Sequence, residues 1–468
     1  MLSPDYRIDP QLSRYLCRSS FARLGGESKR NYTDDYRLFF DFLWQRGRWW
    51  HEADIEDLWD YEDWRTRSPR NPVRVGGARW NRGLAALSRL YAWGVSTGVV
   101  ARSPVAMREV PGRYGAPVRV PEARAPQTRS SNVHWLTPRA FRLWLEVGLR
   151  RHTVDGVPGQ GWTGRLEARN TAFAELLFSS GVRLTEGASL LTFEMPQPTL
   201  GAGRFVLGRL GRAVTKSKRA RTFYVAAAVV SAVAGYVESS RAAAVRRAQR
   251  RGRYEDLAAY RVVRAVTGMR QKVLHWRDTQ GRVGRTALAD AGVAERMSFY
   301  REGPQGLEPL WLWLTEEGLP LRPASWENVF RTASQRCEQV LAGRVAEPPF
   351  CTPHMCRHSF ALHMLVVLHH VMDRRMGLSV QERRDFQLLY GDVWRMVQDL
   401  LGHAQVETTR DFYLAPVADL RLRSLLAEPA PLAEGAAAPS AQWVSSLLAR
   451  IAQESEGVQD LDSALGLG

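Results

Sequence analysis

The residue types needed to cut a phosphodiester with a tyrosine occur in order along the chain, at Arg183, Lys216, His354, Arg357, His403 and Tyr413. Two arginine forks suit the negative charge that builds on the equatorial oxygens of a phosphorane. A histidine can take a proton from an attacking hydroxyl near neutral pH. A tyrosine can supply that hydroxyl where a base and nearby cations offset its ordinary pKa of about 10. The set therefore predicts strand cleavage by a tyrosine, with no metal ion and no cofactor.

The segment around His354 and Arg357 predicts the start of a helix. Thr352 is a suitable N-cap, and a proline follows at the first helical position. The i, i+3 spacing then places both side chains on one face, at a helix end that favours anions. A His-x-x-Arg pair alone is common, but here it is followed by a Gly-His pair and a tyrosine. His403, after a helix-stopping glycine, can donate a hydrogen bond to a non-bridging phosphate oxygen.

The second arginine candidate, Arg183, follows a glycine that ends a predicted helix at 168–180. Its guanidinium could hold the scissile phosphate. The alternative is a structural salt bridge with Glu186, three residues farther along the chain.

Lysine is rare in this chain, which makes its placement informative. The 65 Lys and Arg residues include only four lysines, at 29, 216, 218 and 272. A lysine can give up a proton near neutral pH, whereas an arginine cannot. We therefore assign Lys216 to protonate the leaving 5′-oxygen, with Lys218 as the second candidate. The alternative is chance placement of both lysines in a solvated turn.

Composition indicates the partner. The chain has 468 residues, a net charge of +17 and 45% hydrophobic residues, which suits a globular protein of roughly three domains that binds a polyanion. Nucleic acid is the first candidate partner, and an anionic membrane surface is the second. No apolar run is long enough to span a bilayer, and the N-terminus lacks the apolar core of a signal peptide. We expect a cytoplasmic location, on the bacterial nucleoid.

Cysteine and histidine patterns argue against a metal site. The four cysteines have neither metal-ligand nor disulfide-framework spacing, so we expect them to be reduced and structural. The neighbours His369 and His370 lack a third ligand in the pattern.

Residues 1–102 are expected to form a helical domain. Ser28 is the predicted N-cap of one helix, and Asp54 is the predicted N-cap of another. A third amphipathic helix is expected to end near 94–98. We assign the aromatic residues of this domain mainly to its core, and the alternative for some of them is a DNA-facing position. These aromatics include Trp49, Trp50, Trp59 and Trp64.

Residues 103–134 are rich in proline and arginine and are predicted to form a linker without regular helix. The arginines could lie along a phosphate backbone. The alternative is a solvated linker that makes no contact.

Residues 135–426 are expected to form a second domain. Thr137 and Pro138 predict a helix start, and another helix is expected at 324–342. Alternating residues at 205–207 and 222–225 predict two strands on either side of the lysine turn. Two further stretches, near 236–300 and 366–392, are interpreted as insertions, the first being helix plus an arginine-rich segment.

Residues 427–468 form an acidic tail, with six acidic residues and one basic residue, a net charge of −5. Within it, the segment 443–451 has the apolar spacing of a short amphipathic helix. Such a tail either packs on its own domain or docks onto a neighbouring subunit.

Taken in order, these residues resemble the tyrosine recombinase, or phage integrase, family. The family's Gly-x-Arg-x-x-Glu pattern falls on 181–186, its hairpin lysine on Lys216 and its Leu-Gly-His on 401–403. The family's His-x-x-Arg falls on His354 and Arg357, and its nucleophile on Tyr413.

The resemblance implies a mainly α fold with a small β-sheet or hairpin (α+β), in which a helical core-binding domain and a catalytic domain form a C-shaped clamp on duplex DNA. It further implies a 3′-phosphotyrosine intermediate and a homo-tetramer on DNA that docks through the C-terminal tail. Accessory DNA-bending or directionality factors would be further partners. Integrase or transposase of a mobile element is the expected role.

The sequence departs from the family pattern at the nucleophile and in the two insertions. Tyr413 lies one residue farther from His403 than is usual, and Phe412 occupies the expected place. A one-residue bulge would absorb the shift.

Four alternatives stay open. They are a dimer resolvase, a non-catalytic DNA-binding relative, a type IB topoisomerase and a basic membrane-surface protein. The last lacks a basic amphipathic helix.

Overall fold

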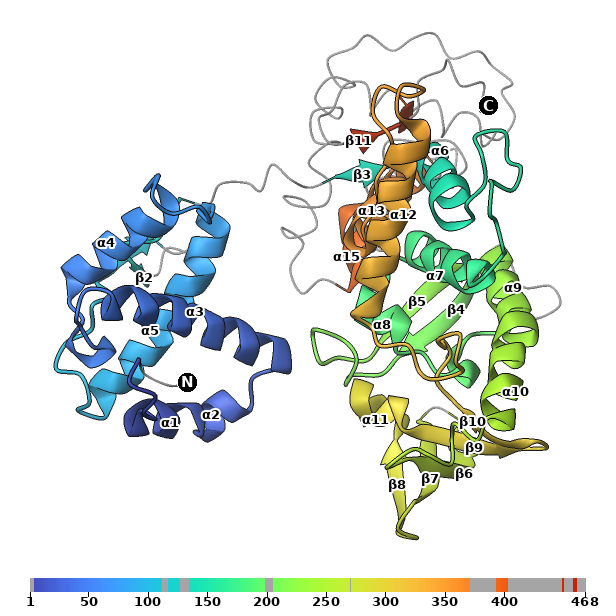
Figure 1. Cartoon of the computed structure of the whole chain (residues 1–468), viewed down its shortest axis with the longest axis horizontal. Helices are drawn as coiled ribbons and strands as arrows, with labels where there is room; N and C mark the ends of the chain where they lie inside the picture. Colours follow the sequence, from blue (N-terminus) through green and yellow to red (C-terminus); the bar gives the residue numbers. More distant parts are fainter. Residues whose placement is uncertain are drawn as a thin grey trace, which may run out of the picture. The chain divides into compact units, whose positions relative to one another are not determined.

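The computed structural model describes residues 4–111, 117–126, 134–197, 205–269, 271–370, 393–402, 448–449 and 458–460. His403, Phe412 and Tyr413 lie outside these residues, as does most of the tail. The chain divides into two units, Met1–Ser131 and Asn132–Gly468 (Figure 1). Within the described ranges, no helix is long and apolar enough to cross a membrane.

The first unit is helical and is packed around aromatic side chains. Its helices are α1 (Pro10–Leu16), α2 (Ser19–Ala22), α3 (Gly26–Trp44), the short η1 (Trp50–Glu52), α4 (Ile55–Thr66) and α5 (Gly77–Ser96). Asp54 caps α4, because its carboxylate accepts a hydrogen bond from the Asp57 N–H at 3.1 Å, which confirms that prediction. The prediction for Ser28 was wrong, since α3 begins at Gly26 and Gly25 is its N-cap.

The tryptophans of the first unit divide between core and surface. Trp50 is 1% exposed and stacks on Phe40, as expected for the core. Trp49 and Trp59 keep more than a third of their surface exposed. Burial in the aromatic core therefore accounts for only some of these residues.

Part of the range 103–134, which was expected to be a linker, is folded onto the first unit. Strands β1 (Met107–Pro111) and β2 (Pro117–Pro121) pair antiparallel. Farther along, Ala125 donates its N–H to Asn81 Oδ1 at 2.9 Å and accepts from the Asn81 amide at 3.0 Å. The Trp80 indole donates to the Ala123 carbonyl at 2.7 Å. The prolines exclude helix here, as predicted, but they permit an edge hairpin.

The second unit is built around α7 (Glu167–Ser180), most of whose side chains are buried. Against this helix lie α13 (Pro353–His370), α9 (Ala227–Tyr236) and β5 (Arg221–Ala226). Strand β4 (Phe205–Leu210) pairs antiparallel with β5, which confirms the predicted hairpin. The other elements that the structure describes before and after the inserted sheet are β3 (Trp135–Leu136), α6 (Pro138–Leu143), η2 (Trp144–Leu149), α8 (Leu184–Ala188), η3 (Thr192–Glu194), η4 (Val237–Arg241), α10 (Ala242–Arg250), α12 (Ser325–Leu341), α15 (Val393–Leu401) and β11 (Val458–Gln459).

Several helix boundaries in this unit confirm the sequence predictions. Thr137 caps α6, with its hydroxyl accepting from the Ala140 N–H at 3.2 Å. Helix α7 ends at Gly181, which has the left-handed conformation of a C-cap. Helix α12 falls close to the expected range. Each of these boundaries is set by a local side-chain or backbone preference.

The inserted region contains a five-stranded sheet that was not predicted. Its strand order is β10-β9-β6-β7-β8, and Figure 1 shows it at one end of the second unit, beyond α10. Its elements are β6 (Arg261–Thr267), β7 (Val273–Asp278), β8 (Val283–Ala287), η5 (Leu288–Asp290), α11 (Val293–Met297), β9 (Phe299–Gly303) and β10 (Gly306–Pro309). Helices α10 and α11 confirm the expectation of helix in this insertion. The other insertion, 366–392, lies mostly outside the described residues.

The described part of the tail packs on its own unit. Val458 and Gln459 pair parallel with Trp135 and Leu136 of β3. Leu448 is 2% exposed and belongs to an apolar cluster with residues of α13 and α15. These residues therefore follow the first of the two alternatives for the tail, packing on its own domain.

Gly181 is required by both its conformation and its surroundings. Its φ is +62°, and a Cβ would meet Phe360 Cδ1 at 2.3 Å. We predict that Gly181→Ala lowers the free energy of unfolding by about 2–4 kcal/mol, from left-handed strain and overpacking. Thermal and denaturant unfolding of the full chain would measure the loss.

The matched control is Gly235→Ala in α9, where a Cβ would meet nothing within 4 Å. It should raise stability by up to about 1 kcal/mol through helix propensity. Equal stability of the two variants would contradict the packing argument for Gly181.

Candidate active site

The first turn of α13 presents His354 and Arg357, as the sequence predicts. The Thr352 hydroxyl accepts from the Met355 N–H at 3.2 Å, which confirms the cap. His354 is exposed and Arg357 is 0% exposed. The His354 ring also packs edge-on against the His358 ring, with centroids 4.4 Å apart. The helix start therefore carries an exposed His354 and a buried Arg357.

The Arg357 guanidinium joins three helix ends. Its Nη1 donates to the Gly181 carbonyl at the end of α7, and its Nη2 donates to the Leu401 carbonyl at the end of α15, at 2.6 Å for the second contact. A guanidinium carries five N–H donors in a fixed fork. These two contacts therefore fix the orientation of the group.

Arg183 forms the salt bridge that was raised as an alternative. It is the N-cap of α8, and its Nη1 lies 3.1 Å from Glu186 Oε1. Glu186 Oε2 accepts from the Arg183 backbone N–H at 2.9 Å and from Arg221 Nη2 at 2.6 Å. The Arg183 side chain keeps 24% of its surface exposed. A salt bridge and an accessible guanidinium thus coexist at this residue.

Glu186 is the buried anion between these two arginines, with 1% of its surface exposed. Burial acts to raise the pKa of Glu186. The Arg221 guanidinium, the Arg183 N–H and the Arg183 guanidinium outweigh burial and hold that pKa below its usual value. The carboxylate is therefore charged at neutral pH and orients both guanidinium groups.

The turn between β4 and β5 separates the two candidate lysines. Lys218 has a φ of +55° and donates Nζ to the Ala213 carbonyl of its own turn at 3.4 Å. Lys216 is exposed, and its charge is one of those that act on His354. This arrangement favours Lys216 as the proton donor.

The pKa of His354 depends on several of the predicted site residues. Burial of its imidazole, followed by the charges of Arg357, Arg183 and Lys216, lowers the pKa of His354 to about 4. His354 also keeps an exposed surface, so an anion can enter. Such an anion would offset the effect of the three cations on the His354 pKa. Three other predicted site residues, Arg357, Arg183 and Lys216, therefore act electrostatically on this imidazole. The other two, His403 and Tyr413, lie outside the described residues.

Arg221 is a further residue of the site, which the motifs of the sequence do not single out. Its side chain bridges Glu186 and the Leu400 carbonyl, at 3.1 Å for the latter. A Cβ on Gly402 would meet Arg221 Cδ at 2.6 Å. The signal for this residue was its place at the first position of the strand that follows the lysine turn.

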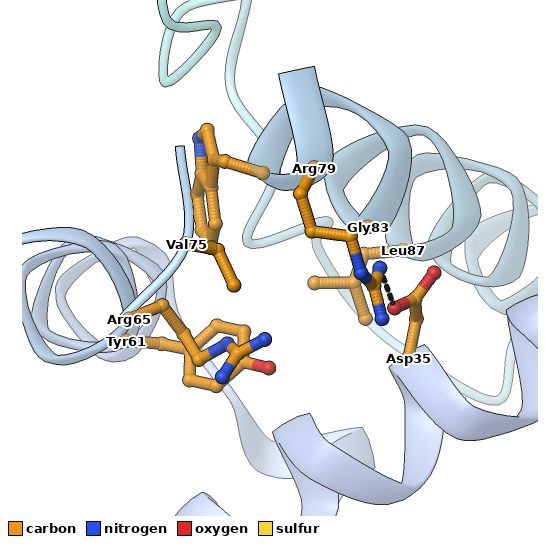
Figure 2. Close-up of a pocket in the computed structure, with 8 residues that line it drawn as sticks. Asp35, Tyr61, Arg65, Val75, Arg79, Gly83 and Leu87 are labelled. Carbon is orange, nitrogen blue, oxygen red and sulfur yellow. Dashed lines mark hydrogen bonds and ion pairs between the residues drawn. The ribbon is translucent and has the colours of Figure 1, made fainter. Parts of the chain in front are cut away.

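A small hollow in the first unit is unrelated to this site. Figure 2 shows Arg79 reaching the Asp35 carboxylate, with Arg65 beside Tyr61 on the opposite wall. Arg79 Nη1 lies 2.5 Å from Asp35 Oδ1, and Arg82 Nε lies 3.4 Å from Oδ2. The hollow contains none of the six predicted site residues. These contacts describe a structural ion pair between α3 and α5.

Metal and disulfide chemistry find no support in the described part of the chain. It holds no group of three His, Cys, Asp or Glu side chains placed to bind a metal ion. The four cysteines are free thiols, and Cys351 Sγ lies 3.5 Å from Cys356 Sγ. Burial raises the pKa of the Cys351 thiol well above its usual range.

No family model matches the chain. No curated protein matches its sequence. Among solved structures, the chain matches the XerA recombinase at 14% identity with a TM-score of 0.33, covering 90% of this chain and 100% of that one. It matches the XerH site-specific recombinase bound to palindromic difH substrate, in a post-cleavage complex, at 14% identity with a TM-score of 0.45, covering 91% and 90%. It matches a lambda integrase dimer bound to a COC′ core site at 10% identity with a TM-score of 0.41, covering 86% and 94%.

The chain is similar to tyrosine recombinases. The functional argument rests on the residues described above.

Replacing Glu186 tests the carboxylate between the arginines. We predict that Glu186→Gln lowers the free energy of unfolding at pH 7 by about 2–3 kcal/mol, because two guanidinium groups lose their buried anion. The folded-state pKa of Glu186 is below its ordinary value of 4.5. The contribution is therefore complete above pH 4.5 and is lost as pH falls through the lowered pKa.

Unfolding of both proteins at pH 7 and at lower pH would measure this effect, with the exposed Glu238→Gln as control. If the difference in free energy of unfolding between wild type and Glu186→Gln stays the same at low pH, the charge argument is contradicted.

The cations around His354 lead to a second prediction. The His354 imidazole should titrate near pH 4 in the free protein. Vanadate or phosphate at the site should raise that pKa toward its ordinary value, because the added anion offsets the three cations. NMR titration of the ring protons, with His358→Gln to aid assignment, would measure both values. An unshifted His354 pKa in the free protein would refute the proximity of the cations.

Proposed function

We propose that the chain is a tyrosine recombinase that cuts and rejoins duplex DNA through a 3′-phosphotyrosine intermediate. The observation that supports this most is the convergence of Arg183, Lys216 and Arg357 on His354. Two guanidinium groups and a proton donor that act on one base suit a phosphodiester. The net charge of +17 suits the same polyanion.

In the cleavage step, the Tyr413 hydroxyl attacks the scissile phosphorus and passes its proton to His354. The bond between phosphorus and the 5′-oxygen breaks, and Lys216 gives its proton to that oxygen. The products are a 3′-phosphotyrosine and a free 5′-hydroxyl. Arg183, Arg357 and His403 stabilise the charge on the non-bridging oxygens during the step.

The rejoining step is the reverse reaction with another strand. A 5′-hydroxyl attacks the phosphotyrosine, Lys216 accepts its proton and Tyr413 leaves with a proton from His354. The ester bond energy is kept in the intermediate, so the exchange requires no ATP. The side chains named above supply all the proton transfers.

The pKa of His354 depends on whether an anion is bound. With a pKa of about 4 in the free site, the imidazole is neutral at pH 7 but a weak base, since a general base works best when its pKa is near the working pH. A bound phosphodiester would raise that pKa, so the base becomes stronger when the substrate is in place. The same cations thereby hold the phosphate and keep the base unprotonated until it arrives.

Recombination between two sites requires an assembly, for which we propose a homo-tetramer on DNA that docks through the C-terminal tail. An apolar hollow of about 560 Å³ is lined by residues of β4, β5, α13 and α15. It lies on the same helices as the cluster that holds Leu448. A tail that docks on a neighbouring subunit would have to move away from this cluster of its own subunit. DNA-bending or directionality factors would act on this assembly.

We assign the enzyme to a mobile element, as integrase or transposase. A dimer resolvase would use the same chemistry, and typical resolvases are shorter than this chain. The five-stranded insertion therefore weighs against a resolvase.

The second candidate function is a DNA-binding protein that has lost turnover. It is favoured by one sequence feature, the position of Phe412 where the family's tyrosine is expected. This candidate keeps the cationic pocket and predicts specific binding without covalent chemistry.

A covalent-adduct assay would decide between these functions. DNA from the ends of the protein's own element would be mixed with wild type, Tyr413→Phe and Phe412→Tyr. We expect an SDS-resistant, protease-sensitive protein–DNA adduct in wild type, lost in Tyr413→Phe because the nucleophilic oxygen is gone. Lys216→Ala should slow adduct formation by about 10²–10⁴-fold, the usual contribution of a general acid.

Specific DNA binding without an adduct in wild type, but with one in Phe412→Tyr, would establish the DNA-binding alternative. An adduct that persists in Tyr413→Phe would place the nucleophile elsewhere.

A further inference from the structure

We propose that the inserted sheet positions Lys216 for proton donation. The contact runs through η5, which follows β8, to the turn between β4 and β5. The inference deepens the role of Lys216 and therefore rests on the proposed function. Arg212, Asp290 and Arg296 become positioning residues, since they act through Lys216 and the turn rather than on the substrate.

The turn and η5 meet backbone to backbone. The Ala213 N–H donates to the Ala289 carbonyl at 2.9 Å. A Cβ on Gly211 would lie 2.8 Å from Ala289 Cα and 3.0 Å from its carbonyl oxygen. Only a residue without a side chain permits this approach at position 211. The turn is therefore seated on the insertion by direct main-chain contact.

A bidentate ion pair between Arg212 and Asp290 also constrains how the turn is oriented on η5. Arg212 donates both Nε and Nη2 to the two oxygens of Asp290, with Nη2 to Oδ2 at 2.7 Å. Both side chains are more than 40% exposed, so the pair adds little to stability. A bidentate fork nevertheless fixes relative orientation. The contribution of this pair is therefore geometric.

The interior of the turn passes that orientation on to Lys216. Thr215 precedes the lysine and is 2% exposed. Its hydroxyl lies 3.1 Å from the Arg212 carbonyl and 2.8 Å from the Arg219 carbonyl, so it closes the turn across both ends. A displacement of Arg212 consequently moves Thr215 and the lysine beside it.

Arg296 of α11 ties the same segment to the helix that carries Arg183. The guanidinium is 1% exposed, with Nε to the Ala291 carbonyl at 2.8 Å and Nη2 to the Leu288 carbonyl at 3.0 Å. Its Nη1 donates to the Ser189 carbonyl at 3.1 Å and pairs with Glu194. Ser189 is the C-cap of α8, and Arg183 is the N-cap of that helix. The insertion thus sets Lys216 and Arg183 relative to one another.

The chemistry of the leaving group separates positioning of Lys216 from general damage. When the bond between phosphorus and a 5′-oxygen breaks, the oxygen needs the lysine's proton. When sulfur replaces that oxygen, the bond breaks to a stable thiolate that needs no proton. A variant that only misplaces Lys216 is therefore slow on the oxygen substrate and normal on the sulfur substrate.

The experiment compares single-turnover adduct formation on two identical duplexes, one with a 5′-bridging oxygen and one with a 5′-bridging sulfur. The variants are Gly211→Ala, which pushes the turn off η5, and Asp290→Asn, which weakens the fork. Lys216→Ala is the reference for a lost proton donor. Glu302→Gln is the matched control, because Glu302 pairs with Arg264 on the same sheet away from the turn.

On the oxygen substrate we expect Gly211→Ala to be slower by about 10- to 100-fold, the size of effect that misplacing a catalytic group has. Asp290→Asn should be slower by about three- to tenfold, since one charge-assisted contact is weakened. On the sulfur substrate both should come within about twofold of wild type, as should Lys216→Ala, because no proton is needed. Glu302→Gln should match wild type on both substrates.

Two results would overturn the inference while leaving the proposed function intact. One is an equal slowing of Gly211→Ala on both substrates, which would indicate damage outside proton donation. The other is a wild-type rate for Gly211→Ala on the oxygen substrate. The proposed function fails separately, if wild type forms no adduct with either duplex or if sulfur does not rescue Lys216→Ala.

Discussion

The Glu186 carboxylate lies buried between the Arg183 and Arg221 guanidinium groups, and the geometry of the whole site depends on it. Arg221 carries the connection on to the Leu400 carbonyl, while Arg357 holds the next carbonyl, that of Leu401. Two arginines thus donate hydrogen bonds to the last turn of α15. Because Gly402 packs on Arg221, the point at which the chain leaves α15 toward His403 is set by the same charges. One buried anion therefore organises residues from α8, β5 and α15.

The positive charges around His354 favour the binding of an anion at this site. Three cations act on the His354 imidazole, and one of them, Arg183, also pairs with Glu186. Such an arrangement is unfavourable in isolation, because like charges repel and the imidazole cannot be protonated easily. A phosphodiester relieves the repulsion and restores the basicity of the histidine. Binding and activation of the base are thereby two effects of the same charge.

Local signals in the sequence predicted much of this structure. Thr352 and Thr137 cap helices, and Gly181 ends one, because each preference is satisfied within a few residues. The lysine hairpin followed from simple alternation of residue types. Ser28 was a wrong N-cap because α3 begins two residues earlier, at Gly26.

The features that were missed depend on contacts distant in sequence. Arginines interrupt the strands of the inserted sheet, and their acidic partners, such as Glu302 for Arg264, come from other strands. The importance of Arg221 depends on Glu186, 35 positions earlier in the chain. No local pattern carries that information. His403 and Tyr413 remain predictions from sequence.

The pairing of β11 with β3 has a topological consequence for the nucleophile. The chain is anchored at Gly402 by the end of α15, and again at Leu448 and Val458 on the same unit. The sequence between these anchors, which includes Tyr413, therefore begins and ends on one unit. Two anchors on one body raise the effective concentration of a tethered segment near them. An exchange of this segment between subunits must either keep both anchors in place or first separate the pairing of β11 with β3.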